Sequence, residues 1–150
     1  MRRTGFAVAA LLVAFALPGC GGGEEEAEAS AEDALTLTLA EQAGSGQSGT
    51  ATLTADDDER TRVVVELSNP PGASQPSHVH SGTCGDIGEV VAPLESVDGG
   101  SAESVVPMSL KELRGGDLIV HAHKSEAESK ISVACAEIPK AESESRSYGY

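Results

Sequence analysis

The residues best suited to chemistry are four histidines, which fall into two His-x-His pairs, His78 with His80 and His121 with His123. In a β-strand, residues i and i+2 project from the same face, so each pair places two imidazoles side by side. If the two strands are neighbours, four imidazoles meet in one patch. Neutral imidazole binds copper, zinc, nickel and iron, and a planar set of nitrogens suits copper(II) best. The spacing predicts a metal site, with copper favoured. The alternative is that two exposed strand faces use histidine as a polar residue.

The second pair ends an apolar run, and the parity of that run predicts where the site lies. Alternate apolar side chains from Leu118 to Ala122 share the face that would pack on a core, so His121 and His123 point the other way. We therefore expect the site on the outer face of the sheet, beneath whatever the loop at residues 82–88 covers.

Short alternating segments predict an all-β domain over residues 34–139. Seven or eight antiparallel strands with turn signals every eight to twelve residues are typical of a β-sandwich or barrel. Ser109 and Glu112 form a capping-box pattern that predicts one short helical turn. The strand carrying His78 and His80 is joined by strands expected at 35–39, 50–55, 60–67, 89–94, 102–106, 118–123 and 131–136.

The first nineteen residues have the pattern of a targeting segment. Arg2 and Arg3 precede an apolar run of about a dozen residues, which is too short to span a bilayer. The segment ends in Leu17-Pro18-Gly19-Cys20 and resembles the bacterial lipoprotein signal, which is cut before a cysteine that is then acylated. The resemblance implies lipidation at Cys20 and a location on the extracytoplasmic face of the cell membrane. An ordinary secretory signal, with Cys20 incidental, is the alternative.

The remaining composition limits the partners. Residues 20–33 are a glycine- and glutamate-rich stretch expected to be a flexible tether, and residues 140–150 a polar tail. Without residues 1–19 the chain has eight Lys and Arg residues against 24 Asp and Glu residues, a net charge of −16. Such a charge repels nucleic acid and attracts cations. We therefore expect a metal ion as a partner and no nucleic acid. The membrane is expected as a partner through the lipid anchor at Cys20, and no protein partner is identified.

The chain contains three cysteines. If Cys20 carries lipid, Cys84 and Cys135 remain as a candidate disulfide in an oxidising compartment. Two buried free thiols are the alternative.

At these residues the chain resembles the Cu/Zn superoxide dismutase family. That family has a His-Val-His strand, a cysteine shortly after it, a late Val-Val-His strand and a final Ala-Cys-Gly strand. The resemblance covers about residues 35–138 and implies a Greek-key β-sandwich, a disulfide between the two cysteines, and His78, His80 and His121 as copper ligands. The matching segments here are His78-Val79-His80, Cys84, Ile119-Val120-His121 and Val133-Ala134-Cys135.

The chain also departs from that family. Residues 85–89 are short and contain no histidine where the enzymes carry a bridging histidine and zinc ligands, so zinc is not expected. The family's substrate-guiding arginine is replaced by Ser132, with Lys130 nearby on the same face, and His123 is an additional histidine. A strongly acidic protein without that cationic guide should react slowly with an anion such as superoxide. Whether the domain is an enzyme stays open, and these departures argue against it.

Two functions are compatible with this pattern. The first is a lipid-anchored domain that binds one copper ion and buffers or delivers copper, or dismutates superoxide weakly. The second follows from a resemblance to small secreted domains of the chordin-domain (CHRD) type, which have His-x-His-x-Gly segments. It is a non-catalytic structural or interaction module that binds no metal.

Overall fold

The computed structural model describes residues 34–141. The expected signal peptide at 1–19, the lipidation site Cys20, the tether at 20–33 and the tail from residue 142 onward lie outside the described residues. The helix described within 34–141 has four residues, so no helix there has the length and apolarity needed to cross a membrane.

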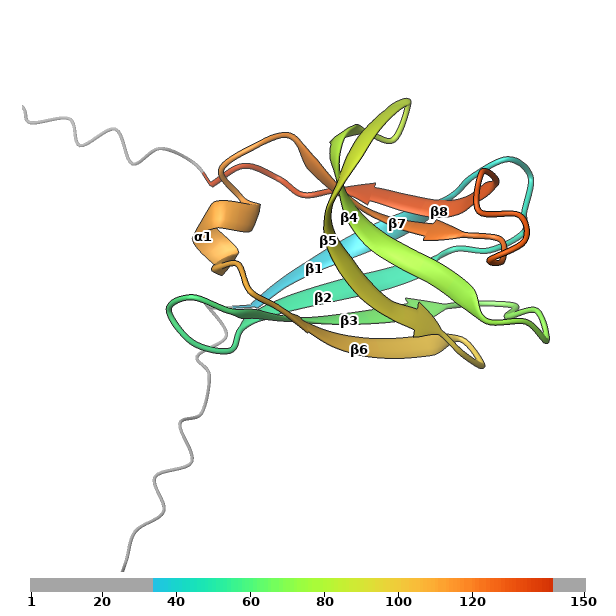
Figure 1. Ribbon diagram of the computed structural model, residues 1–150, viewed down its shortest axis with the longest axis horizontal. Coiled ribbons are helices and arrows are strands. Elements are labelled where there is room, and N and C mark those ends of the chain that lie inside the picture. The colour runs from blue at the N-terminus through green and yellow to red at the C-terminus, as the bar shows by residue number, and fades with distance from the viewer. Residues whose placement is uncertain (1–33, 142–150) are drawn as a thin grey trace, which may run out of the picture.

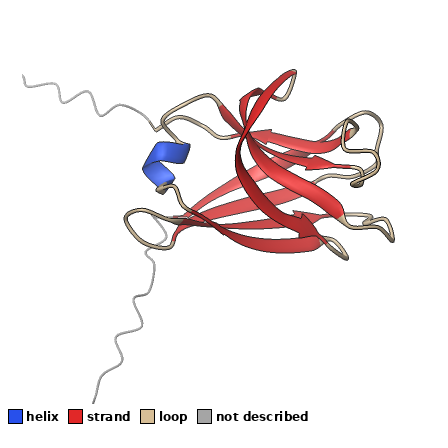
Figure 2. Ribbon diagram, viewed as in Figure 1, coloured by secondary structure: helices blue, strands red, loops and turns tan. Residues whose placement is uncertain are grey.

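The described domain is almost entirely β-structure, as the sequence predicts (Figure 2). Eight antiparallel strands lie in one strongly curved sheet in the order β5-β4-β7-β8-β1-β2-β3-β6 (Figure 1). The elements are β1 (Ala34–Glu41), β2 (Gly49–Ala55), β3 (Thr61–Leu67), β4 (Gln75–Thr83), β5 (Asp86–Val97), β6 (Ser101–Val106), α1 (Leu110–Leu113), β7 (Leu118–His123) and β8 (Ser132–Glu137).

The sheet has two halves that are joined by a short pairing. Strands β1, β2 and β3 form an antiparallel meander, and β6 pairs with β3. Strands β5, β4, β7 and β8 form the other half, and only Ala40 and Glu41 of β1 pair with β8. Because β6 returns beside β3 while β4 lies in the opposite half, strands β3 to β6 make a Greek-key connection.

The two edge strands, β5 and β6, approach each other and almost close the sheet into a barrel. They are joined by a tight turn at Gly99 and Gly100, both of which have positive φ. The backbone N–H of Glu95 in β5 donates to the Ser104 hydroxyl of β6 at 2.8 Å. The edge position of β5 agrees with Pro93 inside it, because proline cannot donate to a strand ladder.

The apolar core lies between the two halves and follows the alternation of the strands. In β3 the side chains of Val63, Val65 and Leu67 point inward, as predicted, while their neighbours face solvent. Helix α1 places Leu113 against this core, and the predicted capping box of Ser109 and Glu112 begins the helix. Other core residues are Leu37, Leu39, Leu53, Val79, Val97, Val106, Val120 and Val133.

The segment from 82 to 88, which the sequence suggests is a loop, is instead the tip of a β4–β5 hairpin. Strand β4 continues to Thr83 and β5 begins at Asp86, so only two residues form the turn. Two glycines permit this close pairing. Gly82 has a φ of +99°, and a Cβ at Gly88 would lie 2.4 Å from the Ser81 hydroxyl oxygen and 2.9 Å from the Ser81 carbonyl oxygen. The hairpin projects above the rest of the sheet (Figure 1).

Candidate metal centre

The two histidine pairs lie on adjacent strands. Strands β4 and β7 are hydrogen-bonded neighbours in which His78 stands opposite His121 and His80 stands opposite Ile119. Directly opposite residues of an antiparallel pair project from the same face. The predicted convergence of all four imidazoles on one patch, which we call the histidine patch (His78, His80, His121 and His123), is therefore present.

The histidine patch lies on the face of the sheet away from the core, as the parity of β7 predicts, but it is largely covered. His121 and His123 are 2% and 9% exposed, and His80 is 7% exposed. Only His78 is half-buried. Ile119 is fully buried and does not belong to the core cluster, so a second, smaller covered layer exists on this face.

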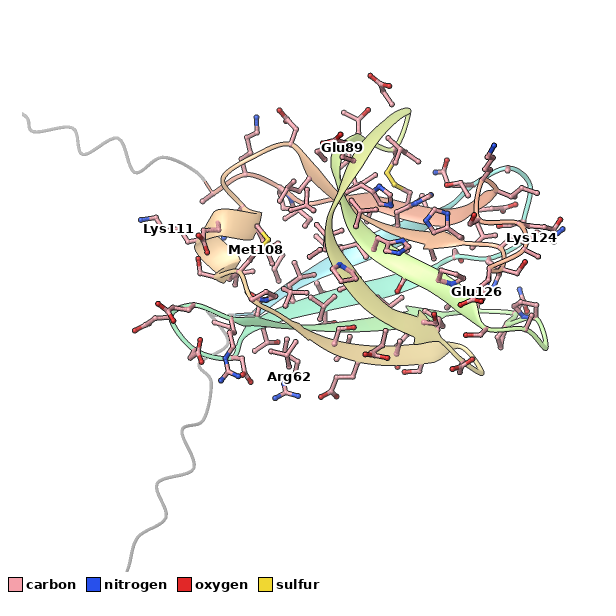
Figure 3. The ribbon with its side chains drawn as sticks, viewed as in Figure 1. Arg62, Glu89, Met108, Lys111, Lys124 and Glu126 are labelled. Carbon is pink, nitrogen blue, oxygen red and sulfur yellow. A yellow bond between two sulfur atoms is a disulfide. The ribbon has the colours of Figure 1, made fainter. Side chains whose placement is uncertain are left out.

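A disulfide holds part of that cover in place. Cys84, at the turn of the β4–β5 hairpin, is bonded to Cys135 of β8 with a Cα–Cα distance of 5.8 Å. Cys135 stands opposite His121 in the β7–β8 pairing, so the bond lies beside the histidine patch. Figure 3 shows this bond in yellow between the projecting hairpin and β8. The pairing expected for these two cysteines is thus present in the structure.

The four rings are in mutual contact. The ring centroids of His78 lie 5.4 Å from His80 and 5.2 Å from His123, and those of His80 and His123 are 5.8 Å apart. The His121 ring packs at 4.4 Å from His123 and at 5.3 Å from His80. All of these pairs are edge-to-face, so an edge of one ring points toward the face of the next.

Hydrogen bonds fix the orientation of two of the rings. Nδ1–H of His80 donates to the carbonyl oxygen of Gly88 at 3.1 Å, which leaves Nε2 as the nitrogen with a free lone pair. Nε2 of His121 is hydrogen-bonded to the hydroxyl of Ser132. In addition, Nε2 of His123 lies 3.1 Å from Nδ1 of His78.

Three ring nitrogens are buried without a hydrogen-bond partner among residues 34–141: Nε2 of His80, Nδ1 of His121 and Nδ1 of His123. A buried polar atom without a partner costs about 1–3 kcal/mol, and most such atoms in folded proteins are paired. Three in one patch are nitrogens that a bound ligand could satisfy. A metal ion fits, because an imidazole nitrogen with a free lone pair is a ligand atom.

The surroundings of three rings in the patch favour their neutral form. Burial, followed by the neighbouring rings of His123, His80 and His78, lowers the pKa of His121 to about 4. Burial and the ring of His80 lower the pKa of His78, and burial and the rings of His78 and His80 lower the pKa of His123. Neutral imidazole is the form that binds metals, so these three rings need no deprotonation step near pH 7.

The geometry does not treat the four histidines alike. Among residues 34–141, one group of potential ligand residues is close enough to hold an ion, and it consists of His78, His80 and His123, whose ligand nitrogens all lie within 4.8 Å of one another. The family resemblance implies His121 in place of His123. His121 is adjacent to this group but is not part of it.

Three contacts that support the site are not visible in the sequence. The Gly88 carbonyl orients His80, and the Ser132 hydroxyl contacts His121. The buried Gln75 side chain donates from Nε2 to the carbonyl oxygen of His123 at 3.3 Å and to the side-chain oxygen of Gln47 at 2.8 Å. Each contact joins positions that are separated in sequence or uses a backbone atom, so residue spacing carries no signal for it.

Comparison with protein-family models, curated proteins and solved structures finds no match to this chain.

Proposed function

We propose that this protein is a membrane-anchored lipoprotein of the bacterial cell envelope whose barrel domain holds one copper ion at the histidine patch. The observation that carries the proposal is the convergence of four imidazoles on one covered patch, where three of them offer ligand nitrogens within 4.8 Å of one another. Copper is favoured over harder ions because the patch offers only nitrogen ligands.

The distances support a single ion. Two nitrogens bound to one ion at about 2.0 Å lie about 2.8–3.3 Å apart, for angles between square-planar and tetrahedral. The nitrogens of His123 and His78 are 3.1 Å apart. The other separations in the group are at most 4.8 Å, so those nitrogens must approach each other by up to about 1.5–2 Å to reach the same range.

The proposed location rests on the resemblance of Leu17 to Cys20 to a lipoprotein signal. The disulfide between Cys84 and Cys135 agrees with an oxidising, extracytoplasmic compartment. There the domain would buffer or deliver copper. Dismutation of superoxide would be at most slow, because the chain carries a net charge of −14 and Ser132 takes the place of the guiding arginine.

One observation favours a second candidate, a metal-free structural or interaction module. The 3.1 Å contact between His78 and His123 is also a normal imidazole–imidazole hydrogen bond, which needs no ion.

Copper titration against a competing chelator, followed by electron paramagnetic resonance, separates the two candidates. The first predicts one copper(II) ion per chain with a nitrogen-ligand spectrum, and at least a 100-fold loss of affinity in the double variant His78→Ala with His80→Ala. The control Asp58→Asn changes an exposed carboxylate and should bind copper as wild type does. Equal binding by the double variant and wild type would leave the metal-free module. A dismutase assay on the copper-loaded protein then distinguishes an enzyme from a carrier.

A further inference from the structure

We infer that the ion is bound by three nitrogens, from His78, His80 and His123, and that His121 positions His123 without binding the ion. This inference rests on the proposed function and adds the ligand set. It differs from the set implied by the family resemblance, in which His121 is a ligand and His123 is additional.

The distances between ring nitrogens favour this ligand set. The ligand nitrogens of His78, His80 and His123 lie within 4.8 Å of one another, and no nitrogen of His121 completes a larger group within that range among the described residues. In the ring-to-ring contacts, His121 approaches His123 and His80. These contacts place the His121 ring beside the group without adding one of its nitrogens to it.

The hydrogen bonding of His80 also favours this ligand set. Its Nδ1–H donates to the Gly88 carbonyl, which fixes the tautomer and leaves Nε2 buried and without a partner. Metal-binding histidines commonly donate their second ring N–H to a carbonyl in this way, because the contact orients the ring and raises the basicity of the ligand atom. The β4–β5 hairpin, bonded to β8 through Cys84 and Cys135, holds that carbonyl in place.

The contact between the ring nitrogens of His78 and His123 favours this ligand set as well. Nε2 of His123 and Nδ1 of His78 face each other at 3.1 Å, a separation that two nitrogens bound to the same ion also adopt. The backbone of His123 is held by the buried Gln75 side chain through its carbonyl oxygen. His123 is therefore anchored at its backbone and oriented at its ring, as a ligand needs to be.

His121 is anchored differently. Its Nε2 is engaged by the Ser132 hydroxyl, and its ring packs edge-to-face against His123 with a centroid separation of 4.4 Å and an interplanar angle of 78°. The contact limits the rotation of the His123 ring toward His121. Ser132 and His121 thus act on the ion through His123, which makes them positioning residues.

A three-nitrogen set has a functional consequence. A four-coordinate ion bound by three protein nitrogens keeps one position for an exchangeable ligand. Of the four rings, only His78 is half-buried, so the exchange side of the site is the side of His78.

The test is a matched pair of variants in the full mature chain, loaded with copper(II). We expect wild type to show three nitrogen ligands by pulsed electron paramagnetic resonance. His123→Gln should show two nitrogens and at least a 1,000-fold loss of affinity. His121→Gln should keep three nitrogens and lose about 10–100-fold, the range usual for residues that orient a ligand. Ser132→Ala, which removes one hydroxyl, should also keep three nitrogens.

The outcomes separate the two proposals. Four nitrogens in wild type, or loss of a nitrogen in His121→Gln with three retained in His123→Gln, would overturn the ligand set while leaving a copper protein. No copper binding by wild type would overturn the proposed function itself. Circular dichroism of each metal-free variant reports folding, and the wild-type nitrogen count decides the question even if one variant fails to fold.

Discussion

Removing the disulfide should cost a large part of the stability of the domain. Cys84 and Cys135 are 51 residues apart in sequence. In the chain-entropy relation, a cross-link that closes a loop of this length stabilises the fold by about 4 kcal/mol at 25 °C. The bond also ties the β4–β5 hairpin, which projects from the sheet, to β8. We therefore expect the double variant Cys84→Ala with Cys135→Ala to lose about 3–5 kcal/mol, from a domain total of typically about 5–15 kcal/mol.

The measurement is unfolding in guanidinium chloride with a metal chelator present, so that metal binding does not contribute. Far-ultraviolet circular dichroism is the suitable signal because the chain has no tryptophan. Wild type under reducing conditions is the matched control, since it loses the bond and keeps both sulfur atoms. Its loss should agree with that of the double variant within about 1 kcal/mol. A loss below about 1 kcal/mol in both samples would refute the reasoning, because the unfolded chain would then gain little freedom when the bond is absent.

Three further predictions concern single residues. With metal chelated, the free energy of unfolding should fall as pH is lowered from 6.5 to about 4. The pKa of His121 is about 4 in the folded chain and 6.5 in the unfolded chain, so over this range the unfolded chain binds a proton that the folded chain does not. His121→Gln should reduce this loss by about 1–2 kcal/mol after allowance for solvent screening, measured by chemical denaturation at pH 7.5 and pH 4. Gly82→Ala should lower the free energy of unfolding by about 2–4 kcal/mol, because φ is +99° and the added Cβ would lie 2.3 Å from a backbone oxygen. The control Gly72→Ala adds a Cβ in open space and should change it by less than about 0.5 kcal/mol. Leu53→Ala, at a fully buried core position, should cost about 3–5 kcal/mol in the same assay.

Each of these predictions has an outcome that contradicts it. An unchanged pH dependence in His121→Gln would mean that this ring does not carry the proton linkage. Equal effects of the two glycine variants would mean that the hairpin is not as tightly paired as described. A Leu53→Ala loss below about 1 kcal/mol would place this side chain outside the core.

Much of the fold follows from local pattern. The alternation of valine and leucine with polar residues in β1 to β3 has the period of a half-buried strand, and these strands pair as the short turns between them require. The gathering of the four histidines was predictable only on the condition that their two strands are neighbours. A period of two puts both members of each pair on one face of the sheet. The pairing of β4 with β7 then brings the two pairs together.

Local sequence pattern does not predict that the β4–β5 hairpin covers the histidine patch. It also does not predict which of the four histidines are placed to bind an ion. The length of the β4–β5 hairpin depends on a positive φ at Gly82 and on the close approach of Ser81 to Gly88. From the spacing of residues alone, this glycine-containing segment is interpreted as a loop. The distinction between His121 and His123 depends on contacts with Ser132 and Gln75, made across strands and set by twist and side-chain rotamers. Such contacts are properties of the assembled sheet.

Strands β4 and β7 present two different layers on their two sides. Val79 and Val120 point into the barrel, whereas the imidazoles lie on the reverse side, beneath the hairpin. An ion bound as proposed would enter and leave only through the outer layer, and the barrel interior would stay closed. Because the two layers are separate, substitutions among the rings would change or abolish the proposed binding while the barrel continues to fold.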